Sequence, residues 1–176
     1  MINKKLWTSS NMIHNDLLLA KELVYDKCDF ECSYPLIEPE SSEYGACTFE
    51  LNSLSIKYRV AKITPTKIGQ FVTLWKRTAN GPIEPYSASD LIDLVIISTR
   101  KDNHFGQFIF PKSALCKNGI ITNNNREGKR GFRVYPPWDK TISKQAQSTQ
   151  KWQLDFFLEI SSDAEIDLER TKILYR

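Results

Sequence analysis

The most distinctive chemistry in this 176-residue sequence is a run of basic side chains without acidic neighbours. Between Lys57 and Arg77 there are six bases and no Asp or Glu. Lys62, Lys67 and Gln70 stand where a predicted strand ends and a predicted helix begins. Ammonium groups beside the free backbone amides of a helix N-terminus form an anion site. The spacing therefore predicts that phosphate groups bind at this point.

A second group of candidate phosphate ligands lies in and just after a loop rich in Asn and Gly. Its members are Arg126, Lys129, Arg130 and Arg133. Tyr135 and Trp138, in "VYPPWD", are aromatic side chains of the kind that stack on the bases of a single strand. The competing interpretation is a solvated loop tip followed by a rigid turn whose Trp138 belongs to the core.

Acidic and basic blocks alternate along the chain, although the net charge is only +3. Seven acids and one base lie between Asp26 and Glu50, and six acids and no base lie between Asp155 and Glu169. A basic face would attract a polyanion. Blocks of opposite sign would equally well pair with each other, and the sequence leaves both interpretations open.

The elements that must position these side chains begin with a helix over 15–28 and a hairpin over 44–63. Asn52 and Ser53 form the predicted two-residue turn, which pairs Leu51 with Leu54. Counting outward in this register places Glu43 opposite Lys62, beyond an apolar face. A carboxylate and an ammonium group would therefore meet at the far end of the hairpin.

A helix is expected over 65–77, with Thr64 as its N-cap and Pro65 in its first position. Its apolar side chains at helical spacing are Ile68, Phe71, Val72 and Trp75. The apolar run "DLVIIST" then predicts a buried strand over 93–99. Strand, helix and strand in that order predict a right-handed βαβ unit.

Further strands are expected at "GQFIFP" and "GFRVY", and further helices at "PKSALCKNG" and "SKQAQSTQKWQLDFFLEI". "DAEIDLERTKILY" fits a helix or a final strand. Together these patterns predict a single α/β (α+β) domain over 1–176, with a mixed central sheet and flanking helices. No apolar run is long enough to cross a membrane, and the N-terminus lacks the apolar segment of a secretory signal. We expect a cytoplasmic protein with free thiols and no metal site.

Several stretches closely resemble the MepB-like family of small bacterial proteins. They are "KITPTKIGQFVTLWKR", "GQFIFPK", "GKRGFRVYPPWD" and "TQKWQ", and the resemblance extends from about Glu43 to Phe157. The family takes its name from an operon that also encodes a multidrug efflux pump and its repressor. The resemblance therefore implies a bacterial protein from that context.

A more distant resemblance is to the PD-(D/E)xK, or restriction-endonuclease-like, nuclease superfamily. Its core is a helix, three strands, a helix and a strand. The resemblance implies that Glu43 matches the lone acid, Lys62 the lysine, and Gln70 a position near the same cleft. Val60 stands where a second acid belongs. Hydrolysis by this route needs Mg²⁺ held by two or more carboxylates, so we expect vestigial residues and no catalysis.

The sequence is consistent with three functions. The first is binding of DNA or RNA, mainly through phosphate contacts, on a nuclease-like fold and without a cofactor. The second is a divergent Mg²⁺-dependent nuclease. The third is a protein-interaction module linked to regulation of a multidrug efflux operon. No nucleotide-binding or hydrolase motif favours another chemistry.

Overall fold

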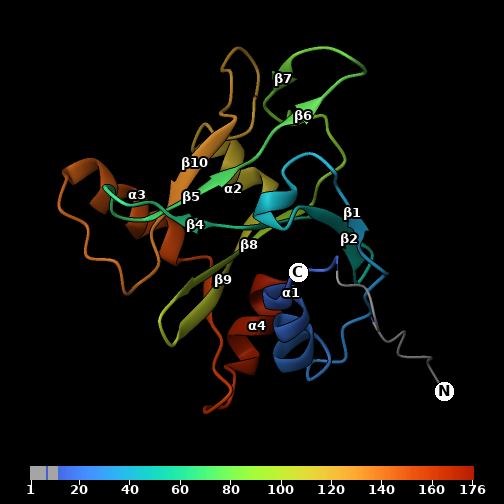
Figure 1. The fold of residues 1–176 in the computed structure, drawn as a ribbon, viewed down its shortest axis with the longest axis vertical. Helices are drawn as coiled ribbons and strands as arrows, with labels where there is room; N and C mark the ends of the chain where they lie inside the picture. The colour runs from blue at the N-terminus through green and yellow to red at the C-terminus, as the bar shows by residue number, and fades with distance from the viewer. Residues whose placement is uncertain (1–6, 8–11) are drawn as a thin grey trace.

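A mixed six-stranded sheet forms the centre of the molecule (Figure 1). The structure is a computed structural model, and it describes residue 7 and residues 12–176. The strand order is β1-β2-β3-β8-β9-β11, and only β3 and β8 are parallel neighbours. The bounds are β1 Leu36–Ile37, β2 Cys47–Leu51, β3 Leu54–Val60, β8 Leu94–Lys101, β9 His104–Pro111 and β11 Phe157–Glu159. The mixed α+β class predicted from the sequence is confirmed.

The β2–β3 hairpin has the predicted register. Leu51 pairs with Leu54, Phe49 with Ile56, and Cys47 with Tyr58. Asn52 and Ser53 both have positive φ, 49° and 67°, as a two-residue turn with the twist of the flanking strands requires. The ladder ends at Cys47, and Glu43 lies instead in a short 3₁₀ turn, Ser42–Tyr44.

The prediction of a helix over 65–77 is wrong. The chain there forms β4 Lys62–Ile63, a loop, β5 Gln70–Thr73 and the short β6 Lys76–Arg77. Val72 and Leu74 are buried at strand spacing, whereas Ile68 is exposed. Gly69, at φ 83°, turns the chain into β5. Alternation of β-branched and aromatic residues outweighed the helical spacing, so the predicted βαβ unit has a β-hairpin where its helix was expected.

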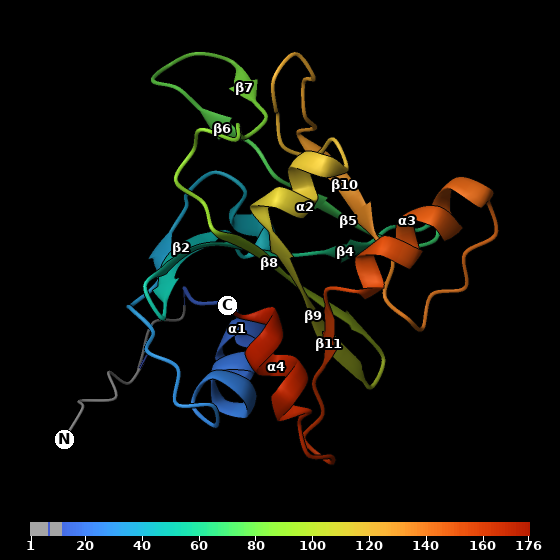
Figure 2. The ribbon, with the colours of Figure 1, turned by 180° about the vertical axis from the view of Figure 1, so that it is seen from behind.

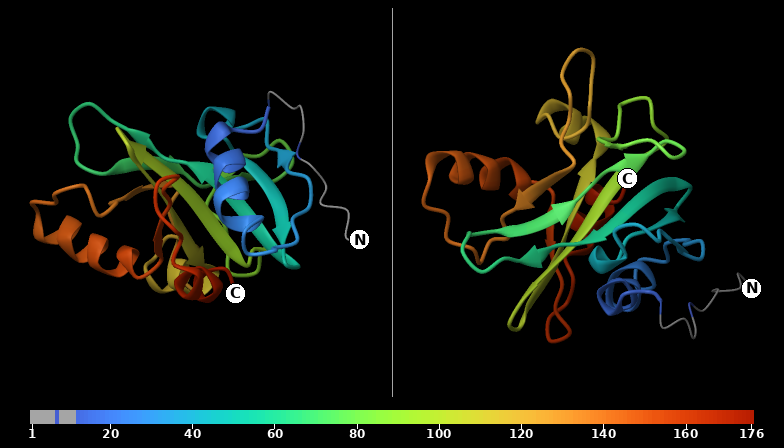
Figure 3. Two further views of the ribbon diagram at one scale, coloured as in Figure 1. Left: turned by 90° about the horizontal axis from the view of Figure 1, so that it is seen from below. Right: turned by 45° about the horizontal axis from the view of Figure 1, so that its top comes forward.

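A second, three-stranded sheet of order β10-β5-β4 is built on that segment, with β10 at Gly131–Val134. A small two-stranded sheet pairs β6 with β7, Ile83–Glu84. Figure 3 shows the β4–β5 hairpin passing over the long β8–β9 hairpin, with its loop directed toward α3. This arrangement carries the loop 64–69 to the edge of the molecule.

The central sheet separates two apolar cores. One face packs against α1 (Asn15–Ala20), its π-helical continuation Lys21–Tyr25, and α4 (Leu168–Leu174), which lie side by side in Figures 1 and 2. The other face packs against β5, β10, α2 (Lys112–Lys117) and α3 (Lys144–Leu154). The helix predicted at "PKSALCKNG" is confirmed as α2, and of the two alternatives for "DAEIDLERTKILY" the structure has the helix, α4.

Two helix boundaries differ from the predictions. The first helix stops at Tyr25 and is followed by a turn. The helix expected from Ser143 onward ends at Leu154, and "FLE" then pairs antiparallel with β9 as strand β11. Phe157 and Leu158 are buried on this strand. In the described part of the chain, every helix is too short or too polar to traverse a bilayer.

A polar network lies buried between the central sheet and the helices α1 and α4. Gln107 Oε1 accepts hydrogen bonds from the hydroxyls of Tyr25 at 2.9 Å and Tyr175 at 2.6 Å. Its Nε2 donates to Ser98 Oγ at 3.0 Å, which contacts the Tyr58 hydroxyl at 2.6 Å. All five side chains are at most 3% exposed, so the network fixes how α4 docks on the sheet.

Candidate functional site

The basic block Lys57–Arg77 is largely neutralised by acids elsewhere in the chain. Five of its six bases form ion pairs at 2.8–3.0 Å: Lys57 and Arg59 with Glu38, Lys62 with Glu43, Lys76 with Asp90, and Arg77 with Glu40. Lys67 is the sixth, and it makes no ion pair within the described residues. For this block, the pairing interpretation of the charge pattern therefore holds at every base except Lys67.

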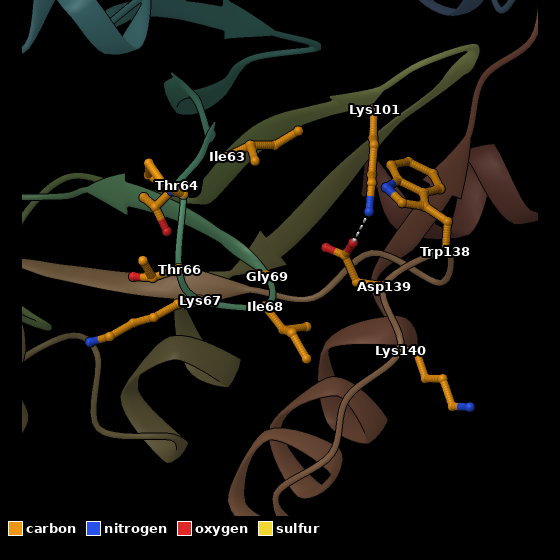
Figure 4. Close-up of a pocket in the computed structure, with 11 residues that line it drawn as sticks. Ile63, Thr64, Thr66, Lys67, Ile68, Gly69, Lys101, Trp138, Asp139 and Lys140 are labelled. Atoms are coloured by element: carbon orange, nitrogen blue, oxygen red, sulfur yellow. Dashed lines mark hydrogen bonds and ion pairs between the residues drawn. The ribbon is translucent and has the colours of Figure 1, made fainter.

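Lys67 lies in a cleft of about 470 Å³ at the edge of the molecule (Figure 4). One wall is the loop between β4 and β5, and the other is the segment after β10 together with the end of β8. The lining residues are Ile63, Thr64, Pro65, Thr66, Lys67, Ile68, Gly69, Lys101, Trp138, Asp139 and Lys140. Two residues predicted to bind nucleic acid, Lys67 and Trp138, thus share one cleft.

The cleft is electropositive. Lys67, Lys101 and Lys140 supply three positive charges against the single carboxylate of Asp139. Lys101 Nζ lies 3.3 Å from Asp139 Oδ1, whereas Lys67 and Lys140 have no carboxylate partner in the described part of the chain. Asp139 is 8% exposed and Lys101 is 47% exposed. The formal charge of the cleft is therefore +2, and two of its ammonium groups are available to an anion.

Trp138 is the aromatic side chain of the cleft, and it is half-buried. Its ring stacks on His104, with centroids 5.1 Å apart and planes inclined by 15°. The ring of Phe157 also packs on the indole in a T-shaped arrangement, with centroids 5.6 Å apart and planes inclined by 76°. The buried indole Nε1 has no hydrogen-bond partner within the described residues. The aromatic surface is thus rigid, and it is already half of a stack with an exposed imidazole.

Arg133 holds the wall that carries Lys67. Its guanidinium donates to the carbonyl of Gly69 at 3.1 Å and to Thr64 Oγ1 at 2.6 Å. Tyr135 packs against the other side of this loop, where a Cβ on Gly69 would lie 2.6 Å from the tyrosine ring. Arg133 and Tyr135 therefore position the cleft loop, a structural role for two residues that were predicted to contact nucleic acid.

The remaining predicted residues lie outside the cleft. Gln70 is 1% exposed and donates to the carbonyl of Arg100 at 3.2 Å, so it joins β5 to the end of β8. Arg126 packs over Gly119, and Arg130 pairs with Glu127 at 3.1 Å. Lys129 is exposed and lines a different, smaller cleft.

The arrangement around Glu43 does not fit a hydrolytic Mg²⁺ site. Glu43 and Lys62 meet as predicted, at 3.0 Å, but Glu43 is largely exposed and Lys62 is partly exposed, and the lysine also lies over the Tyr44 ring. Val60, the residue at the position of the missing second acid, packs closely against Gly45: its Cγ2 would lie 3.0 Å from a Cβ at that glycine. Glu40 is engaged by Arg77. In the described chain, no three His, Cys, Asp or Glu side chains gather as metal ligands.

Sequence reasoning missed Lys101, Asp139 and Lys140. Asp139 and Lys140 directly follow Trp138, so their proximity to the cleft could have been found. Lys101 stands at the end of β8, 37 residues before Trp138, and no local sequence pattern connects the two. Only the tertiary fold brings the β8–β9 hairpin beside the "VYPPWD" segment.

Comparisons with known proteins agree with the resemblance seen in the sequence. The model of the MepB-like family matches residues 38–159. The crystal structure of MepB superposes with a TM-score of 0.72 at 34% sequence identity, covering 83% of this chain and 97% of that chain. No curated protein matches this chain. The matched region includes every residue that lines the cleft.

Proposed function

This chain belongs to the MepB-like family, and we propose that it binds single-stranded nucleic acid in the cleft between the loop 64–69 and the segment 138–140. One observation carries the proposal. Among the described residues, Lys67 is the one base of its block without an ion pair, and it shares a cleft with Lys140, which likewise meets no carboxylate there, and with the aromatic ring of Trp138.

Cations beside an aromatic ring are the combination that single-strand-binding grooves use. Ammonium groups follow the phosphate backbone, while bases stack on aromatic faces irrespective of their sequence. In this cleft the phosphates would meet Lys67, Lys101 and Lys140, and a base would extend the stack formed by Trp138 and His104. Contacts to phosphate oxygens carry no base information, so we expect little sequence preference.

The other candidate functions receive less support from the described residues. Cleavage would require carboxylates beside Glu43 that are engaged elsewhere or absent from that surface. An interface between faces of opposite charge loses its basis, because most bases of the block Lys57–Arg77 are neutralised within the chain. A cytoplasmic location is part of the proposal, since the four cysteines are all free thiols, as expected in a reducing compartment.

A salt-resolved binding titration tests the proposal. Fluorescence anisotropy would follow a labelled single-stranded DNA or RNA of about 12 nucleotides, within the range of known single-strand sites. Three phosphate contacts predict a slope of log affinity against log salt of about −2, at roughly 0.7 per contact. Lys67→Ala should flatten the slope by about 0.7.

The chain offers two matched controls. Lys62→Ala removes a lysine five positions away that is already paired with Glu43. Lys172→Ala removes an exposed lysine of α4, on the opposite face of the central sheet. Both should leave the slope closer to the wild-type value than Lys67→Ala does. A protein that binds no oligonucleotide at low salt, or equal effects of Lys67→Ala and Lys172→Ala, would contradict the proposed function.

A further inference from the structure

A second cleft, of about 240 Å³, lies between β10 and α3. Its lining is largely polar and includes Lys129, Arg133, Tyr135 and Gln153. Lys129 is exposed, and it has no carboxylate partner in the described part of the chain. The only acid near it in sequence, Glu127, is engaged by Arg130. A second uncompensated ammonium group therefore stands at a concave surface.

The floor of this cleft is rigid because α3 is fastened to the outer edge of β10. The buried Gln153 side chain donates to the carbonyl of Arg133 at 2.9 Å and accepts from the amide of Tyr135 at 2.8 Å. These two bonds take the place of a further strand on β10, the outermost strand of its sheet. The cleft is therefore a preformed hollow between two fixed elements.

Arg133 and Tyr135 connect the second cleft to the loop that forms one wall of the first. Both side chains line the second cleft. Arg133 also donates to Thr64 and Gly69, and Tyr135 packs on Gly69, and these two residues line the first cleft. The two clefts are therefore neighbours, separated by the side chains of Arg133 and Tyr135.

We propose that the second cleft is a further phosphate-binding subsite for the same single strand, with Lys129 as its ligand. The inference rests on the proposed function, because it assigns a longer footprint to that binding. The physical reason is charge and the proximity of the two clefts. Within the described residues, a lysine without a carboxylate partner stands at each of two neighbouring concave surfaces, and one extended strand offers a phosphate to each of them.

This inference makes the effect of Lys129 depend on the length of the ligand. An oligonucleotide of about three nucleotides fills the first cleft alone, whereas one of about ten lies within the range of full single-strand sites. Lys67 contacts both ligands, while Lys129 contacts the longer one only. A lysine that acted through general charge would affect both lengths alike.

The experiment compares both lengths against wild type, Lys67→Ala, Lys129→Ala and the control Lys172→Ala by competition anisotropy at about 50 mM salt. Losing one phosphate contact with a slope of about 0.7 corresponds to roughly fivefold to tenfold weaker binding at this salt. We expect that loss for Lys129→Ala with the long oligonucleotide, and less than about twofold with the short one. Lys67→Ala should weaken both, and Lys129→Glu should enlarge the length-dependent loss.

Two results would overturn the subsite while leaving the proposed function intact. One is equal binding of the long oligonucleotide by Lys129→Ala and Lys172→Ala. The other is equal weakening of both lengths by Lys129→Ala. Failure of the wild-type protein to bind either length would remove the proposed function and the subsite together. Because Lys129 is exposed, the variants should fold as wild type does, and thermal unfolding checks this.

Discussion

Removing the negative charge of Asp139 should strengthen nucleic-acid binding. Of the described residues, Asp139 alone contributes a carboxylate to the cleft, and its Oδ1 lies 3.3 Å from Lys101 Nζ. A phosphate taken up by Lys101 would sit about 2.8 Å beyond the ammonium group. Its charge would then lie about 6 Å from the carboxylate when the three groups are in line. The substitution Asp139→Asn keeps the size of the side chain and removes that repulsion.

The size of the effect follows from Coulomb's law. Two like charges about 6 Å apart repel by about 0.7 kcal/mol in bulk water and by about 2.8 kcal/mol at the effective dielectric constant of a protein surface. Salt screens part of this repulsion. We therefore expect about 1 kcal/mol at low salt, or roughly fivefold tighter binding of a single-stranded oligonucleotide. The gain should shrink as salt is added.

The assay is the anisotropy titration at two salt concentrations, with thermal unfolding to show that the variant is folded. Glu165→Gln, which removes an exposed acid ahead of α4, controls for the change in net charge. A variant that loses structure should bind more weakly, so tighter binding by Asp139→Asn cannot be explained by unfolding. If Asp139→Asn binds no better than Glu165→Gln, the phosphate does not lie at Lys101, and the assignment of the cleft is refuted.

Two further predictions concern the protein's stability and thiols. Gln107→Leu leaves the buried hydroxyls of Tyr25 and Tyr175 without their hydrogen-bond acceptor, so it should lower the free energy of unfolding, measured in urea, by about 2–6 kcal/mol. Tyr175→Phe should lower it by only about 1 kcal/mol. Similar losses for the two variants would mean that the network does not act as a unit. Burial raises the pKa of Cys32 to about 12 and that of Cys47 to about 12, from 9.0. Both thiols should therefore resist alkylation at pH 8 until urea unfolds the protein, and stability should fall as pH rises above 9, where only the unfolded thiols ionise. Equally fast alkylation of the native and unfolded protein, followed by mass spectrometry, would contradict this.

The sequence predicted the elements whose side chains alternate without ambiguity. In the β2–β3 hairpin, the turn residues and the apolar face agree on one register, and the structure has that register. The segment after Lys62 supports two periods at once. Phe71, Val72 and Trp75 fit a helix, while Val72 and Leu74 fit a strand. The structure buries the strand set, because β5 pairs on one side with β4, which directly precedes it, and on the other side with β10, which comes from a distant position in the chain.

The candidate site was predictable only in part, for a related reason. The charge pattern identified Lys62 and Lys67 together, and the hairpin register predicted that Lys62 would meet Glu43, although it placed Glu43 on a strand. In the structure a 3₁₀ turn carries Glu43 to Lys62, and Lys67 has no ion pair within the described residues, which no pattern in the sequence predicted. Trp138 was identified by its residue type, whereas Lys101 reaches the cleft only through the fold of the β8–β9 hairpin.

The most direct test of the account is the NMR signal of the Trp138 indole N–H during titration with a single-stranded oligonucleotide. The chain has four tryptophans, so the four indole signals can be assigned by substitution, with Trp138→Phe identifying the one in the cleft. We predict that this signal shifts progressively as ligand is added. The signals of Trp7, in the core beneath the other sheet face, and of Trp75, near Arg77, should stay in place. An oligonucleotide that binds while the Trp138 signal remains unmoved would contradict the central claim.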